Sequence, residues 1–415
     1  MTLQNCFLNT ADKSACSGCS ACASACSHYA ITMQEDAEGF LYPVIDANRC
    51  IHCGLCERLC PINNNGNTSN NGNAPRAFLA YSEHQEFYLA SATIGVCTML
   101  AQYVIGAGGL VYGVSLDEKD WHARHVCVSD RGGIENIRNS KYLQSETGDT
   151  FTQVKDHLSA GKSVLFIGTP CQVAGLKSFL RKDYETLLTI DIICHGIYSY
   201  KLIVKEVEYW QRKLRGKVSN FKFRSKRIYP WYKGGVINFD LKRFWGTRHY
   251  EIPGPLSPTY RCYAYSDDGI NYNLRQSCYA CAFRNKVRYG DITVGDAWFV
   301  DTKKYLGDKP NRWNGISLIF CNNTRGKKYF DSVSHLLHVT EITLADAFRQ
   351  PALLPADRPI PEARTALYQA ISTTEDYAHI IQRILHYDIE QAYRKAFGPK
   401  LRFPSIKRLL TLLHR

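Results

Sequence analysis

The chain has 415 residues and a hydrophobic fraction of 45%, which predict two or three folding units with a sizeable core. Its formal net charge is +13, but residues 1–62 hold three Lys/Arg against six Asp/Glu, so the positive excess lies in the remainder. A basic body beside an acidic head favours docking of one on the other, or binding of acidic carriers and anionic substrates. Zinc-finger, helix-turn-helix and RNA-recognition patterns are absent, so we expect no nucleic-acid partner.

The first residues show no basic region followed by an apolar stretch, so we expect no secretory signal. The chain also contains 17 cysteines, which oxidising compartments convert to disulfides and the cytoplasm keeps reduced. We therefore expect a cytoplasmic location.

Two cysteine runs of the same spacing dominate residues 1–62. The first is Cys16-x2-Cys19-x2-Cys22-x3-Cys26, and the second repeats it from Cys50 to Cys60 and ends in Pro61. This is the spacing of bacterial two-cluster ferredoxins, in which the fourth cysteine of each run binds the other cluster. Zinc sites use pairs of Cys-x2-Cys rather than such triplets. We predict two [4Fe–4S] clusters, one held by Cys16, Cys19, Cys22 and Cys60 and the other by Cys50, Cys53, Cys56 and Cys26.

A polar run rich in Asn and Gly at residues 63–76 predicts a flexible linker. Strands and helices are expected to alternate beyond it, with strands at 77–81, 109–115, 163–167 and 187–193 and helices at 91–105, 150–159 and from 170 on. This alternation is typical of an α/β domain with a partly parallel mixed sheet. The apolar stretch 98–116 contains Gln102 and three glycines, so it fits a buried helix followed by a strand better than a membrane span.

Residues 218–241 alternate as β segments, and helices are expected from about residue 340. The tail 400–415 holds five Lys/Arg and no acid. It predicts either an amphipathic helix on a membrane surface or a terminal helix packed on its own body, and we favour the second. The predicted organisation is an α+β ferredoxin-like head of the two-[4Fe–4S] type at 1–62, the linker at 63–76, an α/β body at 77–325 and a helical extension at 326–415.

Four cysteines outside the head lie in positions that suit metal ligands. Cys171 and Cys194 each follow directly on a predicted strand, where ligands gather in open α/β sheets. Cys278 and Cys281 add a Cys-x2-Cys pair, which completes the four thiolates of a third cluster. The spacing alone also fits structural zinc or buried packing residues. The other cysteines are expected to be packing residues, namely Cys6, Cys97, Cys127, Cys262 and Cys321.

Five motifs follow one another in this part of the chain: Gly168-Thr-Pro-Cys-Gln-Val-Ala-Gly-Leu-Lys177, Asp191-Ile-Ile-Cys-His-Gly196, Phe223-Arg-Ser-Lys226, Leu274-Arg-Gln-Ser-Cys-Tyr-Ala-Cys281 and Asp291-Ile-Thr-Val-Gly-Asp-Ala-Trp298. In this order they resemble the coenzyme F420 hydrogenase/dehydrogenase beta-subunit family. The segments 108–113 and 140–145 fit the same family, so the resemblance extends over residues 77–320.

The resemblance implies FAD beside an iron–sulfur cluster in the body. It places the third [4Fe–4S] cluster on Cys171, Cys194, Cys278 and Cys281, and the flavin contacts on Ser91, Thr93, Gly95, Lys141, Tyr142, Gln144, Ser145, Gly168 and Thr169. Ile94 stands where the family usually has glycine, so its side chain would narrow the flavin site.

Three further residues are candidates for roles beside these cofactors. His195, next to Cys194, is a candidate catalytic proton donor, with a purely structural role as the alternative. Arg224 and Lys226 either hold an anionic group or belong to a solvated basic hairpin.

The resemblance and the cysteine spacing together predict a FAD-dependent iron–sulfur oxidoreductase. Electrons would pass from a ferredoxin-type donor through the clusters to FAD and on to a small organic acceptor, and surface-polysaccharide metabolism is among the roles that the resemblance implies. Two alternatives are an electron-transfer subunit that acts only with a catalytic partner, and an assembly protein that has lost flavin.

Overall fold

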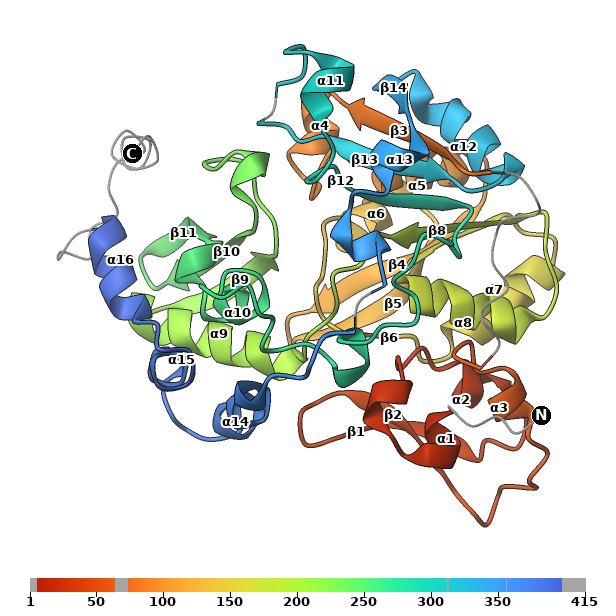
Figure 1. Cartoon of the computed structure of the whole chain (residues 1–415), viewed down its shortest axis with the longest axis horizontal. Coiled ribbons are helices and arrows are strands. Elements are labelled where there is room, and N and C mark those ends of the chain that lie inside the picture. The colour runs from red at the N-terminus through yellow and green to blue at the C-terminus, as the bar shows by residue number, and fades with distance from the viewer. Residues whose placement is uncertain (1–5, 64–73, 312, 356, 398–415) are drawn as a thin grey trace.

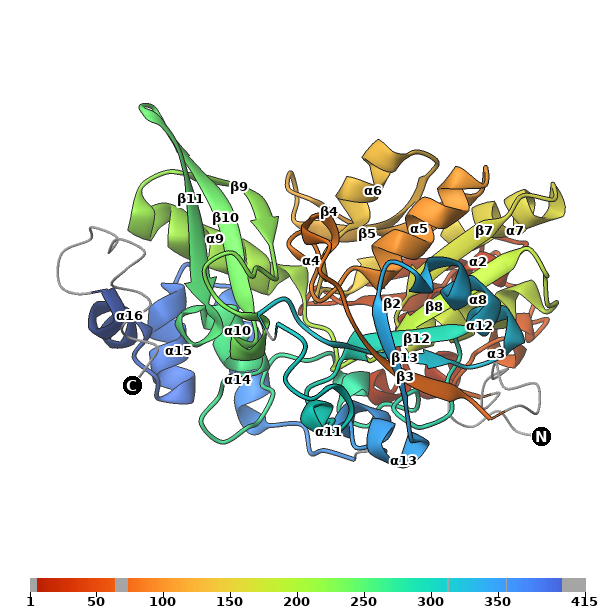
Figure 2. The same ribbon diagram turned by 90° about the horizontal axis from the view of Figure 1, so that it is seen from above.

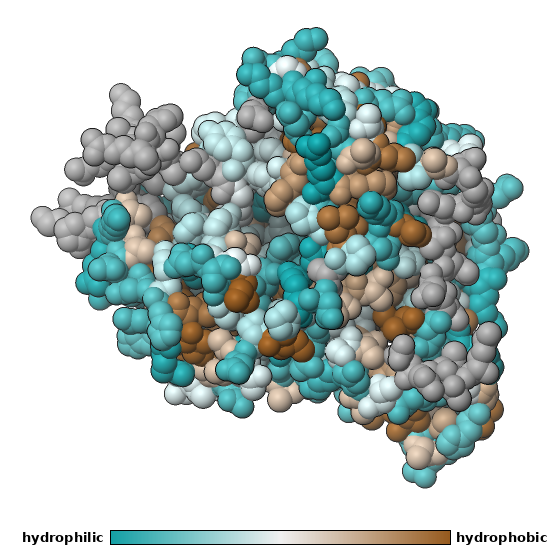
Figure 3. Space-filling view, viewed as in Figure 1, coloured by the Kyte–Doolittle hydropathy of each residue, from teal (hydrophilic) through white to brown (hydrophobic). Residues whose placement is uncertain are grey.

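The computed structural model describes residues 6–63, 74–311, 313–355 and 357–397 (Figure 1). Within these ranges the strands form sheets of two, three and nine strands. Figure 1 shows the small head below the large sheet, and the three-stranded sheet with its helices to one side. Figure 3 shows that the face seen in Figure 1 mixes hydrophilic and hydrophobic side chains rather than presenting one broad apolar surface.

The head repeats one local structure around its two cysteine runs. Helices α2 (Ala21–Ala25) and α3 (Leu55–Arg58) each begin after a residue in the left-handed conformation, Ser20 with φ 66° and Gly54 with φ 66°. Strands β1 (Ile31–Glu35) and β2 (Leu41–Ile45) pair antiparallel between them. The short helices α1 (Phe7–Thr10) and η1 (Lys13–Ala15) precede the first run. The same backbone turn thus follows Cys19 and Cys53.

The nine-stranded sheet has the order β14-β3-β13-β12-β8-β7-β4-β5-β6. Its strands are β3 (Arg76–Tyr81), β4 (Leu110–Asp117), β5 (His122–Val128), β6 (Ser145–Glu146), β7 (Val164–Gly168), β8 (Leu187–Ile192), β12 (Ile292–Asp296), β13 (Ser317–Cys321) and β14 (His338–Ile342). Four neighbouring strands, β4, β7, β8 and β12, run parallel, whereas β13 and β5 flank them antiparallel. The predicted partly parallel mixed sheet is confirmed.

Helices cover both faces of this sheet (Figures 1 and 2). On one face, α5 (Val96–Gly106), α6 (Arg131–Ile137) and α12 (Thr324–Ser334) bury apolar side chains against β4, β7, β8 and β12. On the other face, α7 (Thr150–Ser159) and α8 (Pro170–Leu180) pack on Tyr112, Val164 and Phe166 together with Ala21 of the head. The shorter helices are α4 (Gln85–Tyr88), α11 (Thr302–Leu306) and α13 (Leu344–Ala347), with single 3-10 turns at Gln276–Cys278 and Pro351–Leu353.

A second unit is inserted between the adjacent strands β8 and β12. It comprises α9 (Tyr200–Leu214), β9 (Lys217–Lys222), β10 (Val236–Arg243), β11 (Gly246–Pro253) and α10 (Pro258–Tyr263), with 3-10 turns at Trp231–Lys233 and Gly254–Leu256. The helices α14 (Glu362–Ile371), α15 (Tyr377–Leu385) and α16 (Ile389–Phe397) complete its core, which includes Phe40 and Tyr42 of the head. The insertion returns to the sheet through Cys278 and Cys281.

Two expected elements differ from the structure. The helix predicted from residue 91 begins at Val96, because Gly95 precedes it in the left-handed conformation with φ 86° and keeps residues 91–95 in a turn. The segment after residue 326 was expected to be helical, but it also provides β14, which pairs antiparallel with β3. The apolar stretch 98–116 is a buried helix followed by a strand, as predicted.

The structure leaves two predicted features largely undescribed. Most of the predicted linker 63–76 and the whole of the basic tail 400–415 lie outside the described residues. Among the residues that are described, no helix has both the length and the apolar character needed to cross a membrane.

The head is fastened to the body by Arg275, whose side chain is buried. Its Nε donates to the carbonyl of Cys16 at 2.9 Å, and its Nη2 donates to the carbonyl of Leu41 at 3.0 Å. Its Nη1 donates to Oε1 of Gln144 at 3.1 Å, and the guanidinium lies 4.0 Å from the ring centre of Tyr42. One cation of the body therefore satisfies acceptors on both sides of the contact.

We predict that Arg275→Lys loosens the head, because an ammonium group cannot reach these acceptors at the same time. A hydrogen bond to a charged group contributes about 1.5–3 kcal/mol, so loss of one makes opening of the contact at least ~10-fold more frequent. Hydrogen–deuterium exchange of the segment 39–42 should rise accordingly. Arg131→Lys, at an exposed site on α6, serves as the control, and equal exchange in both variants would contradict the assignment.

Candidate iron–sulfur and flavin site

The four body cysteines line one cavity of ≈ 340 Å³. Cys171 lies in the first turn of α8, directly after β7, and Cys194 lies two residues beyond the end of β8. Cys278 ends a 3-10 turn, and Cys281 follows three residues later. Because β7 and β8 are adjacent parallel strands, their carboxyl ends bring Cys171 and Cys194 to the same edge of the sheet. The inserted unit supplies the other two thiols.

The thiols act on one another electrostatically. Burial raises the pKa of Cys171, Cys278 and Cys281 to about 11 in each case, and neighbouring thiols of this group add to the rise. Burial also raises the pKa of Cys194 well above its usual value, with Cys278, Cys171 and Cys281 as the next causes. Thiols in such a buried group stay protonated when no metal is bound. A positively charged metal centre would instead bind them as thiolates.

This donor set fits a four-iron cluster. Four cysteine thiolates are the ligands of a [4Fe–4S] cube, and each binds a different iron. In the described part of the chain, no three His, Cys, Asp or Glu side chains converge tightly enough for a single metal ion.

The cysteines of each head run are arranged around one short helix. Cys16 and Cys19 precede α2, Cys22 lies in it and Cys26 follows it, and Cys50, Cys53, Cys56 and Cys60 take the same positions around α3. Burial raises the pKa of Cys22, and the neighbouring thiols of Cys19 and Cys16 contribute, so these three face one another. Cys26 accepts from the backbone N–H of Ala30 at 3.4 Å. In the second run, Cys53 is exposed, whereas Cys50, Cys56 and Cys60 are partly buried. All 17 cysteines lie in described parts of the chain and are free thiols.

Cys6 also lies at the head clusters, although it was expected only to fill the core. A hydrogen bond with Cys60 is the largest cause of the rise in its pKa, followed by burial. Because Cys6 lies outside both cysteine runs, their spacing did not predict this contact.

Helix α8 contains the candidate body ligand Cys171 and also contacts Cys19, a candidate ligand of the head. The Sγ of Cys19 lies 3.0 Å from the position that a Cβ on Gly175 would occupy. Gly175 is one turn beyond Cys171, and the thiol of Cys171 contributes to the raised pKa of Cys19 after burial. The glycine thus allows the predicted first cluster of the head to lie directly against the helix that begins with a body ligand.

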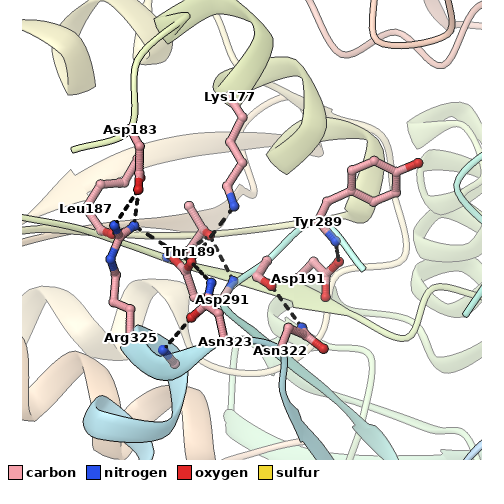
Figure 4. Close-up of polar contacts among 12 residues, drawn as sticks. Lys177, Asp183, Leu187, Thr189, Asp191, Tyr289, Asp291, Asn322, Asn323 and Arg325 are labelled. Carbon is pink, nitrogen blue, oxygen red and sulfur yellow. Dashed lines mark hydrogen bonds and ion pairs between the residues drawn. The ribbon is translucent and has the colours of Figure 1, made fainter. Parts of the chain in front are cut away.

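Two fully buried carboxylates hold the segment after Cys281 in place (Figure 4). Asp191, on β8, accepts from the backbone N–H of Tyr289 at 3.2 Å and pairs with Arg288 at 3.2 Å. Asp291 accepts from the backbone N–H and the hydroxyl of Thr189 at 2.7 and 2.8 Å.

The same carboxylates connect to cations and amides around them (Figure 4). Asn323 donates to Asp291 at 2.7 Å, and Lys177 and Arg325 lie at 3.9 and 3.8 Å. These polar contacts, rather than chemistry at the cavity, explain why the motifs around residues 191 and 291 contain aspartates.

The residues implied for flavin contact separate into two groups. The first group borders the cysteine cavity and consists of Gln144, Ser145 and Thr169, next to Gly168 at the end of β7. Gln144 accepts from the backbone N–H of Leu41 at 2.9 Å, so it belongs to the contact between head and body. Ser145 accepts from Nε2 of Gln172 at 2.9 Å, and the Thr169 hydroxyl lies 3.1 Å from Sγ of Cys171.

The second group, formed by Ser91, Thr93, Gly95, Lys141 and Tyr142, surrounds buried cations. Arg224 donates to the Tyr142 hydroxyl at 3.3 Å and forms an ion pair with Asp296 at 3.1 Å. The same carboxylate of Asp296 accepts a hydrogen bond from the Thr93 hydroxyl. Lys226 donates to the carbonyls of Thr93 and Asn314. Arg224 and Lys226 are only 5% and 1% exposed, so the alternative of a solvated hairpin is wrong.

This second group fits an anionic cofactor. Burial lowers the pKa of Lys141 to about 7, with nearby Lys222 as the second cause, and burial likewise lowers the pKa of Lys226 to about 7. Among the described residues, Oγ of Ser91, Nε of Arg224 and Oδ1 of Asn139 are buried without a hydrogen-bond partner. Buried cations and unsatisfied polar atoms together are typical of a site for a phosphate-bearing ligand. Ile94 is itself fully buried in the core beside them.

His195 lines the cysteine cavity with its imidazole ring. Burial lowers the pKa of His195 to about 4, and the positive charges of Arg358 and Arg284 nearby add to this shift. Its Nε2 lies 3.1 Å from the amide nitrogen of Asn271. The ring is therefore uncharged at neutral pH and offers one N–H, which suits a structural or hydrogen-bonding role.

The comparisons with known proteins agree with the cysteine patterns. Residues 161–344 match the family described as the C terminus of the beta subunit of coenzyme F420 hydrogenase/dehydrogenase. Residues 15–64 match the 4Fe-4S dicluster domain.

Two individual proteins are similar over most of the chain. The F subunit of the F(420)H(2) dehydrogenase from Methanosarcina mazei is 20% identical over 342 residues, which cover 79% of this chain and 84% of that protein. A chain of the F420-reducing NiFe hydrogenase complex from Methanosarcina barkeri is 15% identical, with a TM-score of 0.39, over 79% of this chain and 95% of that one. The predicted resemblance is confirmed: this chain is an iron–sulfur protein related to the beta subunits of coenzyme F420 hydrogenases and dehydrogenases.

Proposed function

We propose that this protein is a cytoplasmic flavin-dependent iron–sulfur reductase, which passes electrons from a ferredoxin-type donor to FAD and on to a small organic acceptor. The observation that carries the proposal is the position of α8, which begins with the body ligand Cys171 and contacts the head ligand Cys19 at Gly175. Iron–sulfur clusters supply one-electron transfer, and a flavin accepts either one electron or two. The contact at α8 supports the transfer of electrons between a head cluster and a body cluster in this proposal.

In this proposal, the head at 1–62 holds two [4Fe–4S] clusters through its two cysteine runs, and a linker at 63–76 leads to the body at 77–325. The body cysteines hold a third cluster in the cavity that they share. The extension at 326–415 contributes Arg364, which donates to both carboxylate oxygens of Glu38 at 2.7 and 2.5 Å. This largely buried pair adds a second attachment of the head to the rest of the chain.

The buried residues Arg224 and Lys226 and the partly buried Lys141 define the proposed flavin site. Lys141, Arg224 and Lys226 supply positive charge for the phosphates of FAD, and Ser91 supplies a free hydroxyl. Tyr142 lies among the rings of Phe223, Tyr260 and Tyr263, which give the site an apolar aromatic wall. Gln144, Ser145 and Thr169 connect this wall to the cysteine cavity. Such a mixture of apolar surface and a few placed polar groups is typical of cofactor sites.

A second candidate is an electron-transfer subunit that acts only with a catalytic partner. The similar protein from Methanosarcina mazei is named as a subunit of a dehydrogenase, which favours this alternative. It predicts the same cofactors, but reduction of an organic acceptor only in the presence of the partner protein.

We predict that replacing Cys278 and Cys281 by Ala removes about four irons per chain, because a [4Fe–4S] cube needs its cysteine ligands. Iron and acid-labile sulfide are measured on protein purified without oxygen. The head irons should remain, since neither cysteine lies in the two head runs. Cys127→Ala, at an exposed thiol on β5, is the control. Iron content equal to that of the unchanged protein would refute the third cluster.

We predict that the apoprotein binds FAD more weakly as the pH rises from 6 to 8. Lys141 and Lys226 have pKa values lowered to about 7, so each is charged below this pH and neutral above it. An anionic ligand binds better when these lysines are protonated. Above a lysine's pKa, binding must therefore be accompanied by uptake of a proton, and the affinity falls by up to about tenfold per pH unit for each lysine involved. Quenching of flavin fluorescence measures the affinity.

Lys141→Met should lower the affinity and reduce this pH dependence. Lys119→Met, at an exposed lysine, should change neither. Binding that is independent of pH, or unaltered in Lys141→Met, would show that the flavin phosphates lie elsewhere.

A further inference from the structure

The β10–β11 hairpin ends in two exposed aromatic residues. Arg243 pairs with Gly246 in the ladder, so Phe244 and Trp245 form the whole connection. Phe244 is 95% exposed and Trp245 is 66% exposed, and their rings meet edge to face at 4.3 Å. Tight hairpin turns select Gly, Asn or Asp for their backbone conformation, not Phe and Trp. Turn geometry therefore does not explain these two residues, and their exposure indicates a binding role.

The surroundings of the hairpin tip are basic. The segments 212–217 and 241–250 contain seven Lys/Arg and no Asp or Glu. Lys217 lies opposite Lys242 in the β9–β10 ladder, and the Arg243 guanidinium lies 5.6 Å from the ring centre of Trp245. Arg212 and Lys213 form ion pairs with Asp376 and Glu390.

Four of the five remaining cations near the tip keep their charge available. Within the described residues, Arg215, Lys217, Lys242 and Arg243 have no ion pair with a carboxylate. The tip thus combines apolar rings with cations that are not neutralised by acids of the described chain.

We infer that this hairpin tip docks the protein on an anionic membrane surface. Trp and other aromatic residues favour the interface between lipid headgroups and hydrocarbon, where a ring is buried and a polar edge stays wet. Lysine and arginine beside them attract anionic headgroups. One exposed tip with both features is suited to shallow insertion, with Phe244 and Trp245 among the headgroups and the basic residues around them at the lipid phosphates.

The position of the tip favours a membrane over an acidic electron carrier. Figures 1 and 2 both place the β9–β11 sheet and the head helices α2 and α3 at opposite sides of the molecule. A carrier that delivers electrons must approach the cysteines of the head, whereas a membrane contact has no such requirement. Docking at the hairpin leaves the head free, and it does not depend on the proposed reaction.

The test is co-sedimentation of the full chain with phosphatidylcholine vesicles that contain or lack phosphatidylglycerol. We expect binding to the anionic vesicles only, and weaker binding at high salt. Replacing both Phe244 and Trp245 by Ser should lower the partition coefficient at least about tenfold. Replacing Lys217 and Lys242 by Gln should also weaken binding. Tyr103→Ser, which removes an exposed aromatic ring on α5, is the matched control and should bind normally.

A conservative variant separates insertion from a general loss of structure. Trp245→Phe should still bind vesicles, but it should lose the part of the tryptophan quenching by brominated lipids that Trp245 provides. Iron content should be equal in all variants, which shows that they fold. Equal vesicle binding by the Phe244→Ser/Trp245→Ser variant would overturn the inference and assign any membrane affinity to another segment. Binding to an acidic ferredoxin but to no vesicle would overturn it in favour of a protein partner.

Discussion

Arg275 makes the contact on which the arrangement of the head and the body cysteines depends. It lies three residues before Cys278, yet it donates to the backbone carbonyl of Cys16 in the head. Burying a guanidinium group is costly unless its donors are satisfied, and here carbonyl and amide oxygens of the head and body satisfy them together with the ring of Tyr42. Separation of the head from the body would break these hydrogen bonds, so Arg275 stabilises the contact between them. This links the position of the body cysteines directly to that of the head.

The sheet explains why the four body cysteines, the candidate ligands of a third cluster, converge. The carboxyl ends of β7 and β8 bring Cys171 and Cys194 together, and the insertion between β8 and β12 returns to the same edge through Cys278 and Cys281. Asp191 and Asp291 fix that return, because they accept hydrogen bonds from both of the strands involved and from the segment after Cys281. Gly290 permits this close packing, since a Cβ there would lie 2.5 Å from the backbone nitrogen of Asp191. The two aspartates thus help to position the cavity without lining it, whereas their partner Arg288 is part of its lining.

Local patterns in the sequence predicted much of this and missed the contacts between distant segments. Strands β3, β7 and β8 and helix α7 follow from apolar runs and periodicity, and the cysteine spacing is a local signal. The insertion between β8 and β12, the addition of β14 to the sheet, and the contact of Cys19 with Gly175 depend on tertiary packing, which no local pattern encodes. Arg275 stood within a quoted motif, but only the folded chain shows that its partners are carbonyls of the head. The buried state of Lys226 was equally hidden, because a basic residue in a β segment is usually exposed.

The central claim is that one chain holds three iron–sulfur clusters and a flavin along one path from the head to the body. The most direct measurement is the number of irons and of released flavins per chain, on protein purified without oxygen. The account predicts about twelve irons, since each cube contains four, together with about one FAD. About eight irons and no flavin would contradict it, because the head would then be the only loaded part and the body cysteines and buried cations would serve another purpose.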